Sequence, residues 1–419
     1  MKFIRARKSR IYPTPEQAHQ IDVTLGCCRY VFNHMLERSS KAYARRKQGM
    51  SYYDMQNLLP VMKTYLPWLR DADSQALKYA CRQARDALGK FITGKAGHPR
   101  FKSRKNNIQS YTTTNASSIR VSDGIVRLPI LGEVRCNDSR RIGGQILRAT
   151  VSRKNGRYYV SILYDIEKDV EPIEVHDIIG LDYKSDGLYM DSEGNTADMP
   201  KYFRRSQQRL CRLQKSLSKR RGSKKGERPS GRFKALKTRI GRLQTHIADQ
   251  RSDFLHKTST AIVKRWDAVC VEDLDMRAIS QSLKLGKATM DNGFGEFRRM
   301  LEYKLAERGK AFVKVGRFYP STKTCSVCGN IQPMPLGVRV YTCPSCGSVM
   351  DRDCNAALNI RAEGLGLIGQ ICTARHAGTQ RAETGGPGGT AKCRTEGDDA
   401  LASARDRGFQ PVAAQCRIK

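Results

Sequence analysis

The chain has 419 residues, enough for roughly two to four domains, and a hydrophobic content of 39% that can supply cores while leaving much of the surface polar. Its 76 Lys and Arg against 40 Asp and Glu give a net charge of +36, so a dense polyanion is the expected partner and nucleic acid fits best. A run of about 18 apolar residues, which a membrane span requires, is missing, and the basic start Met1 to Lys8 lacks the apolar stretch of a signal peptide. We therefore expect a cytoplasmic protein with no membrane association.

The first part of the chain predicts a helical lobe over residues 15–104. Thr14 is placed as an N-cap, with Pro15 at the first helical position and Gln17 in reach of a capping box. Apolar residues then recur at helical spacing in two stretches. These residues are Ile21, Leu25, Cys28, Phe32 and Met35 in the first stretch, and Leu77, Cys81, Ala84, Leu88 and Phe91 in the second.

From about residue 110 the hydrophobic period changes to two, which is typical of β-strands. Asp123-Gly124 and Asn155-Gly156 stand between β-branched and aromatic runs, as hairpin turns do. We predict a β-barrel made of residues 1–14 and 105–172, in which the opening segment is the first strand and the helical lobe is an insertion.

The second half predicts alternating strands and helices. Short apolar runs predict buried strands that end at Asp182 and at Glu272, and a further strand at 311–315. A run of helical character follows Asp353. Residues 201–250 carry 17 Lys and Arg against two acids, which predicts two basic helices joined by a flexible loop near 222–231. A solvated basic face is the plainer alternative, but a net +15 in so short a span favours contact with phosphates.

Residues 365–419 are rich in Gly, Thr, Ala and Arg and have little periodicity, which predicts a disordered tail.

Two CxxC pairs provide the most specific local signal. Cys325 and Cys328 are separated by 14 residues from Cys343 and Cys346, and each pair is followed by Gly. Such pairs can converge on one tetrahedral ion, so we predict structural zinc rather than a redox pair, unliganded thiols or a catalytic zinc with an open position. The other ten of the 14 cysteines are scattered, as thiols in a reducing compartment are.

Three acids form a more dispersed candidate site. Asp182 and Glu272 each end a predicted strand, and Asp353 opens a predicted helix. Carboxylates from separate elements can hold two Mg²⁺ or Mn²⁺ ions for phosphodiester hydrolysis, and this order of elements suits an RNase H-like sheet. Solvated or capping acids at the ends of elements remain the alternative on spacing alone.

These features together resemble the TnpB family of transposon-encoded, RNA-guided DNA endonucleases, which are relatives of the type V CRISPR effectors. The matching segments, in chain order, are 12–17, 26–29 with Asn33, 97–102, 180–182, 271–274, 322–324 with the cysteine pairs, and 351–357. They extend over nearly the whole chain up to about residue 363. The ordered combination is specific, whereas each segment alone is weak.

The resemblance implies a multidomain α/β protein with an RuvC nuclease core at 173–320 and 349–364, a zinc ribbon at 321–348, and an N-terminal wedge barrel with an inserted recognition lobe. In such a core Asp182, Glu272 and Asp353 are the metal-binding catalytic acids, and the cofactors are Mg²⁺ or Mn²⁺ together with structural Zn²⁺. The implied partners are a guide RNA derived from the transposon end and double-stranded target DNA beside a short motif that the protein reads. The implied location is the cytoplasm of a prokaryote, in association with the nucleoid.

Two departures and three rival functions accompany this resemblance. A second acid, Asp186, follows Asp182 closely and leaves its share in metal binding open, and Cys354 stands where an aliphatic residue is usual. The rivals are a nuclease-inactive RNA-guided repressor, a strand-joining transposase, and a plain zinc-ribbon nucleic-acid-binding protein. Retention of all three acids argues against the first, and the ordered motifs argue against the second. The sequence is silent on the oligomeric state.

Overall fold

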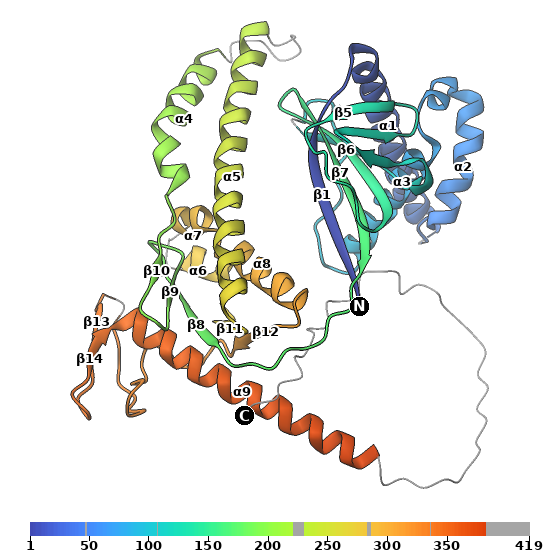
Figure 1. Ribbon diagram of the computed structural model, residues 1–419. Coiled ribbons are helices and arrows are strands. Elements are labelled where there is room, and N and C mark those ends of the chain that lie inside the picture. Colours follow the sequence, from blue (N-terminus) through green and yellow to red (C-terminus); the bar gives the residue numbers. More distant parts are fainter. Residues whose placement is uncertain (47, 107, 221–229, 283–285, 336, 383–419) are drawn as a thin grey trace, which may run out of the picture. The chain divides into compact units, whose positions relative to one another are not determined.

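The computed structural model describes residues 1–419 except 47, 107, 221–229, 283–285, 336 and 383–419 (Figure 1). The chain divides into two compact units. The first comprises Met1–Asp169 with Ser223–Arg242, and the second Val170–Gly222 with Leu243–Lys419. In the described part of the chain, no helix combines the length and apolar character needed to cross a membrane.

A seven-stranded antiparallel sheet organises the first unit. Its strands, in spatial order, are β2 (Ile108–Thr113), β6 (Gln145–Lys154), β7 (Arg157–Glu167), β1 (Lys2–Tyr12), β5 (Gly132–Cys136), β4 (Ile125–Leu128) and β3 (Arg120–Ser122). The opening strand β1 pairs with β7 from Lys2↔Glu167 to Ile11↔Tyr158, and with β5 at its end. The predicted membership of the opening segment in this sheet is thus confirmed, while a closed barrel stays a prediction.

Both predicted hairpin turns are present. Asp123 and Gly124 have φ values of 48° and 78°, and Asn155 and Gly156 have 51° and 73°. Positive φ at both central residues matches the right-handed twist of the flanking strands, and Asn, Asp and Gly adopt it most readily. These turns therefore set the register of the β3–β4 and β6–β7 pairs.

Three helices, α1 (Pro15–Arg46), α2 (Tyr52–Tyr65) and α3 (Ser74–Ile92), stand between β1 and β2 in the chain, with a 3₁₀ turn at Pro67–Asp71. The predicted capping box is confirmed, because Thr14 Oγ1 accepts from the N–H of Gln17 at 3.3 Å and Gln17 Oε1 accepts from that of Thr14 at 3.0 Å. The first predicted apolar face is buried throughout. In the second face the prediction was wrong for Phe91, which is exposed because it lies in the last turn of α3, beyond the packed residues.

A five-stranded sheet forms the centre of the second unit, in the order β10 (Thr196–Ala197), β9 (Tyr189–Asp191), β8 (Ile178–Tyr183), β11 (Ala268–Glu272) and β12 (Ala311–Val315). Strands β8, β11 and β12 are parallel and almost wholly apolar, as strands covered on both faces are. The remaining helices of this half of the sequence are α4 (Tyr202–Lys219), α5 (Gly231–Arg265), α6 (Met276–Ser282), α7 (Gly286–Asn292), α8 (Phe294–Ala306) and α9 (Arg352–Ala382). Two basic helices at 201–250 were predicted and are present as α4 and the start of α5, and most of their predicted connecting loop lies outside the described residues.

Helix α9 packs directly on this sheet, and glycine makes the close approach possible. A Cβ atom at Gly180 of β8 would lie 2.2 Å from the carbonyl oxygen of Ala357 and 2.7 Å from the nitrogen of Arg361. The tail predicted to be disordered from residue 365 starts too early, because α9 continues past this point and its Ile368 is buried. Ile360 and Ile368 of α9 join the apolar residues of β8, β11 and β12 in one buried cluster, so this helix gains packing that local composition does not reveal. Residues 383–419 lie outside the described part of the chain.

Candidate active site and cysteine cluster

Two of the predicted acids lie side by side at the ends of parallel strands. Leu181 of β8 pairs with Val271 of β11, so Asp182 and Glu272 are the next residues along two adjacent strands. Asp182 has only 7% of its surface exposed, and Glu272 is partly buried. The parallel register therefore brings two carboxyl groups to the same edge of the sheet.

The third acid, Asp353, is placed by the start of α9. Asp351 caps this helix, because its Oδ1 accepts from the N–H of Asp353 at 2.9 Å and from that of Cys354 at 3.1 Å. Asp353 lies in the first turn and is 5% exposed. Since α9 crosses β8 over Gly180, its first turn comes close to the acids of the sheet.

Asp182 is the acid on which burial and the charges of the other two acids act together. Burial raises the pKa of Asp182 well above its usual range, and the negative charges of Glu272 and Asp353 raise it further. Burial also raises the pKa of Glu272, and a hydrogen bond from the Ser321 hydroxyl opposes this effect. A bound cation relieves the repulsion that the charges of Glu272 and Asp353 exert on Asp182, as it does in metal-binding carboxylate sites.

Two arginines balance the charge of Asp353. Arg352 contributes a nitrogen 2.8 Å from Oδ1, and Arg339, from the segment between the two cysteine pairs, contributes one 3.3 Å from Oδ2. The Arg352 side chain is largely buried, whereas more than half of the Arg339 side chain is exposed. Asp186, which follows β8, is also exposed.

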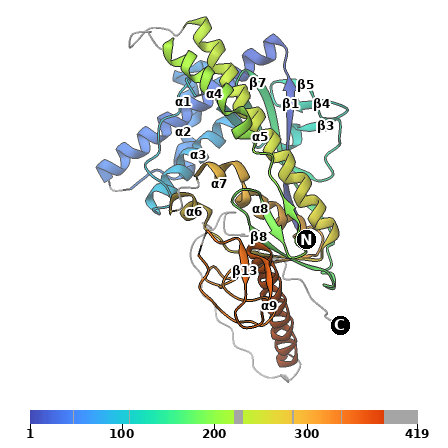
Figure 2. The same cartoon turned by 90° about the vertical axis from the view of Figure 1, so that its left-hand side faces the viewer.

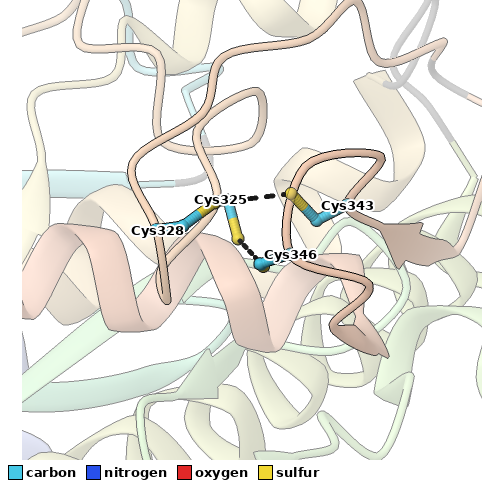
Figure 3. Close-up of side chains that lie close together, drawn as sticks. All are labelled: Cys325, Cys328, Cys343 and Cys346. Carbon is cyan, nitrogen blue, oxygen red and sulfur yellow. Dashed lines mark hydrogen bonds between the residues drawn. The ribbon is translucent and has the colours of Figure 1, made fainter.

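The four predicted cysteines converge. Their sulfur atoms all lie within 4.8 Å of one another, and Figure 3 shows the four side chains meeting from two loops. Cys325 and Cys346 have their sulfurs 3.7 Å apart, and Cys328 and Cys343 have theirs 3.6 Å apart. A tetrahedron of sulfurs, each about 2.3 Å from zinc, has edges of about 3.8 Å, so the donor set fits this ion. Among the described residues, this is the one group of three or more potential ligands gathered so closely.

Glycine explains the local shape of each cysteine loop. Gly329 and Gly347 have φ values of 76° and 72° and donate N–H bonds to the carbonyls of Cys325 at 2.9 Å and Cys343 at 3.0 Å. Such a left-handed residue closes the loop so that both thiols point inward. The pair of short strands β13 (Val340–Thr342) and β14 (Val349–Asp351) holds the second loop beside the start of α9, as Figure 2 shows for β13.

Sequence reasoning missed several polar residues around the two sites. Ser321 binds Glu272, and the buried Asn355 and Asn359 of α9 bind the backbone just before and within the first cysteine pair. The spacing of the two asparagines by four residues, directly after Asp353, was the available signal, since it puts both amides on one face of a helix.

Comparisons with known proteins agree with this arrangement. Three family models match, described as "Helix-turn-helix domain" over residues 1–48, "Probable transposase" over 161–283, and "Cas12f1-like, TNB domain" over 294–360. Among solved structures, the Cas12f1 chain in a complex with sgRNA and target DNA is similar in fold, with a TM-score of 0.52 and 13% identity over 86% of this chain and 99% of that one.

Relatives with closer sequences extend over most of the chain. InsQ of Escherichia coli K12, named "Putative RNA-guided DNA endonuclease InsQ", is 29% identical over 88% of this chain and 94% of its own length. A protein of Streptomyces pristinaespiralis named "Putative RNA-guided DNA endonuclease" is 36% identical over 86% of this chain and 89% of its own. The Streptomyces relative is 36% identical over 86% of this chain, and the transposase and Cas12f1-like family models match residues 161–283 and 294–360. The chain therefore belongs to the TnpB family of RNA-guided DNA endonucleases.

Proposed function

We propose that this protein cuts double-stranded target DNA under the guidance of a bound RNA, and that Asp182, Glu272 and Asp353 form its catalytic site. The observation that supports these residues most directly is that three acids from β8, β11 and α9 come together around Asp182: burial, and then the charges of Glu272 and Asp353, raise the pKa of its carboxyl group. Perturbed carboxyl groups that gather from separate elements are typical of active sites. Solvated or capping acids would not be buried together in this way.

The residues present fit hard divalent cations. Carboxylate oxygens are the ligands that Mg²⁺ and Mn²⁺ prefer, and two carboxylates at the end of the sheet with a third from the first turn of α9 leave further positions for substrate and water. When bound, such ions supply activation of water and stabilisation of the leaving oxygen. The chain itself orients the acids: β8 and β11 set Asp182 and Glu272 side by side, and Arg352 and Arg339 hold the carboxylate of Asp353.

The rest of the architecture follows the same proposal. The five-stranded sheet with α9 serves as an RuvC-type core over 173–320 and 349–364, and the cysteine cluster as a zinc ribbon over 321–348. The seven-stranded sheet, from residues 1–14 and 105–172, serves as the wedge, and helices α1 to α3 serve as the recognition lobe over 15–104. A guide RNA transcribed from the transposon end is the proposed partner. Exposed basic side chains on α4 and at its C-cap, among them Lys215 and Arg220, are proposed to contact phosphates.

Plasmid cleavage by protein copurified with its RNA tests this function. Asp182→Ala, Glu272→Ala and Asp353→Ala should each lower cutting by several orders of magnitude while leaving RNA-guided target binding intact, because recognition rests on base pairing and basic contacts. Asp186→Ala is the matched control, since this acid is close in sequence but exposed, and it should cut at the wild-type rate. Mg²⁺ or Mn²⁺ should support cutting, and Ca²⁺ should not.

The site assignment and the cutting activity would be contradicted by different results. Wild-type cutting by Asp353→Ala would refute the assignment of the site. A wild-type protein that binds its target but never cuts it would instead establish the repressor function.

A further inference from the structure

We propose that Ser321 is a positioning residue of the nuclease site, whose hydroxyl orients the Glu272 carboxylate, and that Asn359 and Asn355 tie its segment to the helix that carries Asp353. The inference rests on the proposed function of the three acids and adds to it a polar connection between those acids and the cysteine cluster. The connection consists of the segment 321–326 and one face of α9.

The first link is the bond between Ser321 and Glu272. Ser321 is almost fully buried, and its hydroxyl donates to Oε1 of Glu272, 49 residues earlier in the chain. A hydroxyl has one proton to donate, and a carboxylate has two oxygens to accept with. Donation to Oε1 fixes the rotation of the carboxylate and leaves Oε2 for a cation. The backbone of Glu272 is held separately, because Arg298 donates to its carbonyl at 3.1 Å.

The second link joins Ser321 to α9. The side-chain amide of Asn359 donates to the carbonyl of Ser321 and to that of Thr324, both at 2.7 Å. One helical turn earlier, the amide of Asn355 donates to the same Thr324 carbonyl at 2.7 Å, and its oxygen accepts from the N–H of Ser326 at 2.9 Å. Both asparagines are buried, at 4% and 0% exposure. Residues 321–326 are thus pinned at three backbone groups by one helix face.

The position of these bonds gives them a consequence for the site. Asp353 lies on the same helix as the two asparagines, and Cys325 lies between the pinned residues Thr324 and Ser326. The distance between Glu272 and Asp353 therefore depends on the Ser321 and Asn359 bonds as well as on the sheet. A buried amide group without a hydrogen-bond partner is costly in free energy. A shift of residues 321–326 would break several of these hydrogen bonds at once, so the structure strongly resists it. A network that served stability alone would not require the Ser321 hydroxyl to donate a hydrogen bond to the carboxylate of Glu272.

Single-turnover cleavage measured against Mn²⁺ concentration separates positioning from stability. Ser321→Thr keeps the hydroxyl, whereas Ser321→Val has the same shape as the threonine variant but no hydroxyl. Both variants add the same volume, so a difference between them measures the effect of the hydrogen bond to Glu272. The Val variant should cut at least tenfold more slowly at saturating Mn²⁺ and need several-fold more Mn²⁺ for half-maximal rate. The Thr variant should cut within about threefold of wild type. Target binding, zinc content and melting temperature should match within the pair.

Ser326→Ala is the matched control, because Ser326 lies on the same segment and its hydroxyl contacts the sulfur of Met350 rather than an acid. It should leave the rate and the Mn²⁺ requirement unchanged. Equal rates and equal Mn²⁺ requirements for the Thr and Val variants would overturn the inference, and so would an equal loss in Ser326→Ala. The proposed function fails differently, through absence of cutting by the wild type or undiminished cutting by Glu272→Ala.

Discussion

Replacement of Gly180 by alanine should damage both the stability and the catalysis of this protein. The added Cβ would lie 2.2 Å from the carbonyl oxygen of Ala357 and 2.7 Å from the nitrogen of Arg361. Ordinary carbon–oxygen contact is about 3.4 Å or more, so α9 must retreat by about 1 Å. Overpacking of this kind costs about 1–3 kcal/mol. Because Asp353 is carried by the first turn of α9, the same retreat would misplace an acid in the site, and a misplacement of about 1 Å can cost about a hundredfold in rate.

Thermal unfolding and single-turnover plasmid cleavage measure the two effects. Gly180→Ala should melt several degrees below wild type and cut about 10- to 100-fold more slowly. Gly366→Ala is the control on the same helix, because a Cβ there meets nothing within 4 Å and alanine favours helix by up to about 1 kcal/mol. That variant should be at least as stable as wild type and equally active. A Gly180→Ala protein with wild-type melting and cutting would refute the argument that this contact sets the position of Asp353.

Three further predictions concern the acids, the cysteines and the basic helices. Because folding raises the pKa of Asp182, ionisation of this carboxyl group destabilises the folded protein at pH values above the unfolded pKa. In protein without added divalent cations, Asp182→Asn should therefore raise the melting temperature at pH 7, and this gain should vanish as the pH falls toward about 4. An equal gain at both pH values would contradict the argument. Elemental analysis should find about one zinc per chain, and Cys343→Ser should lower both zinc content and melting temperature; retention of full zinc by this variant would exclude the tetrahedral assignment. Combined Lys215→Glu and Arg220→Glu should weaken RNA binding regardless of sequence and reduce the log–log salt slope by about 1–2, whereas an unchanged slope would show that these side chains face only solvent.

The sequence alone determined features whose physics is local. The capping box at Thr14 and Gln17, the two hairpin turns with positive φ, and the cysteine loops closed by Gly329 and Gly347 each depend on residues a few positions apart. The order of three acids at the ends of elements was also visible, although the gathering of those acids into one site came from a family resemblance. Local hydrogen bonds and backbone preferences are encoded where they act, so pattern and spacing suffice to predict them.

Contacts between groups far apart in the sequence became visible only in the folded protein. The bond between Ser321 and Glu272, the pinning of 321–326 by two asparagines of α9, and the contact of α9 with Gly180 join residues 29 or more positions apart in the chain. The prediction of disorder from residue 365 failed for the same reason, because Ile368 is ordered by a sheet whose strands lie far earlier in the sequence. Most of the stability of a helix in a protein comes from such packing rather than from its own composition, so the sequence of α9 could not by itself reveal that the helix continues past residue 365 or which residues it holds in place.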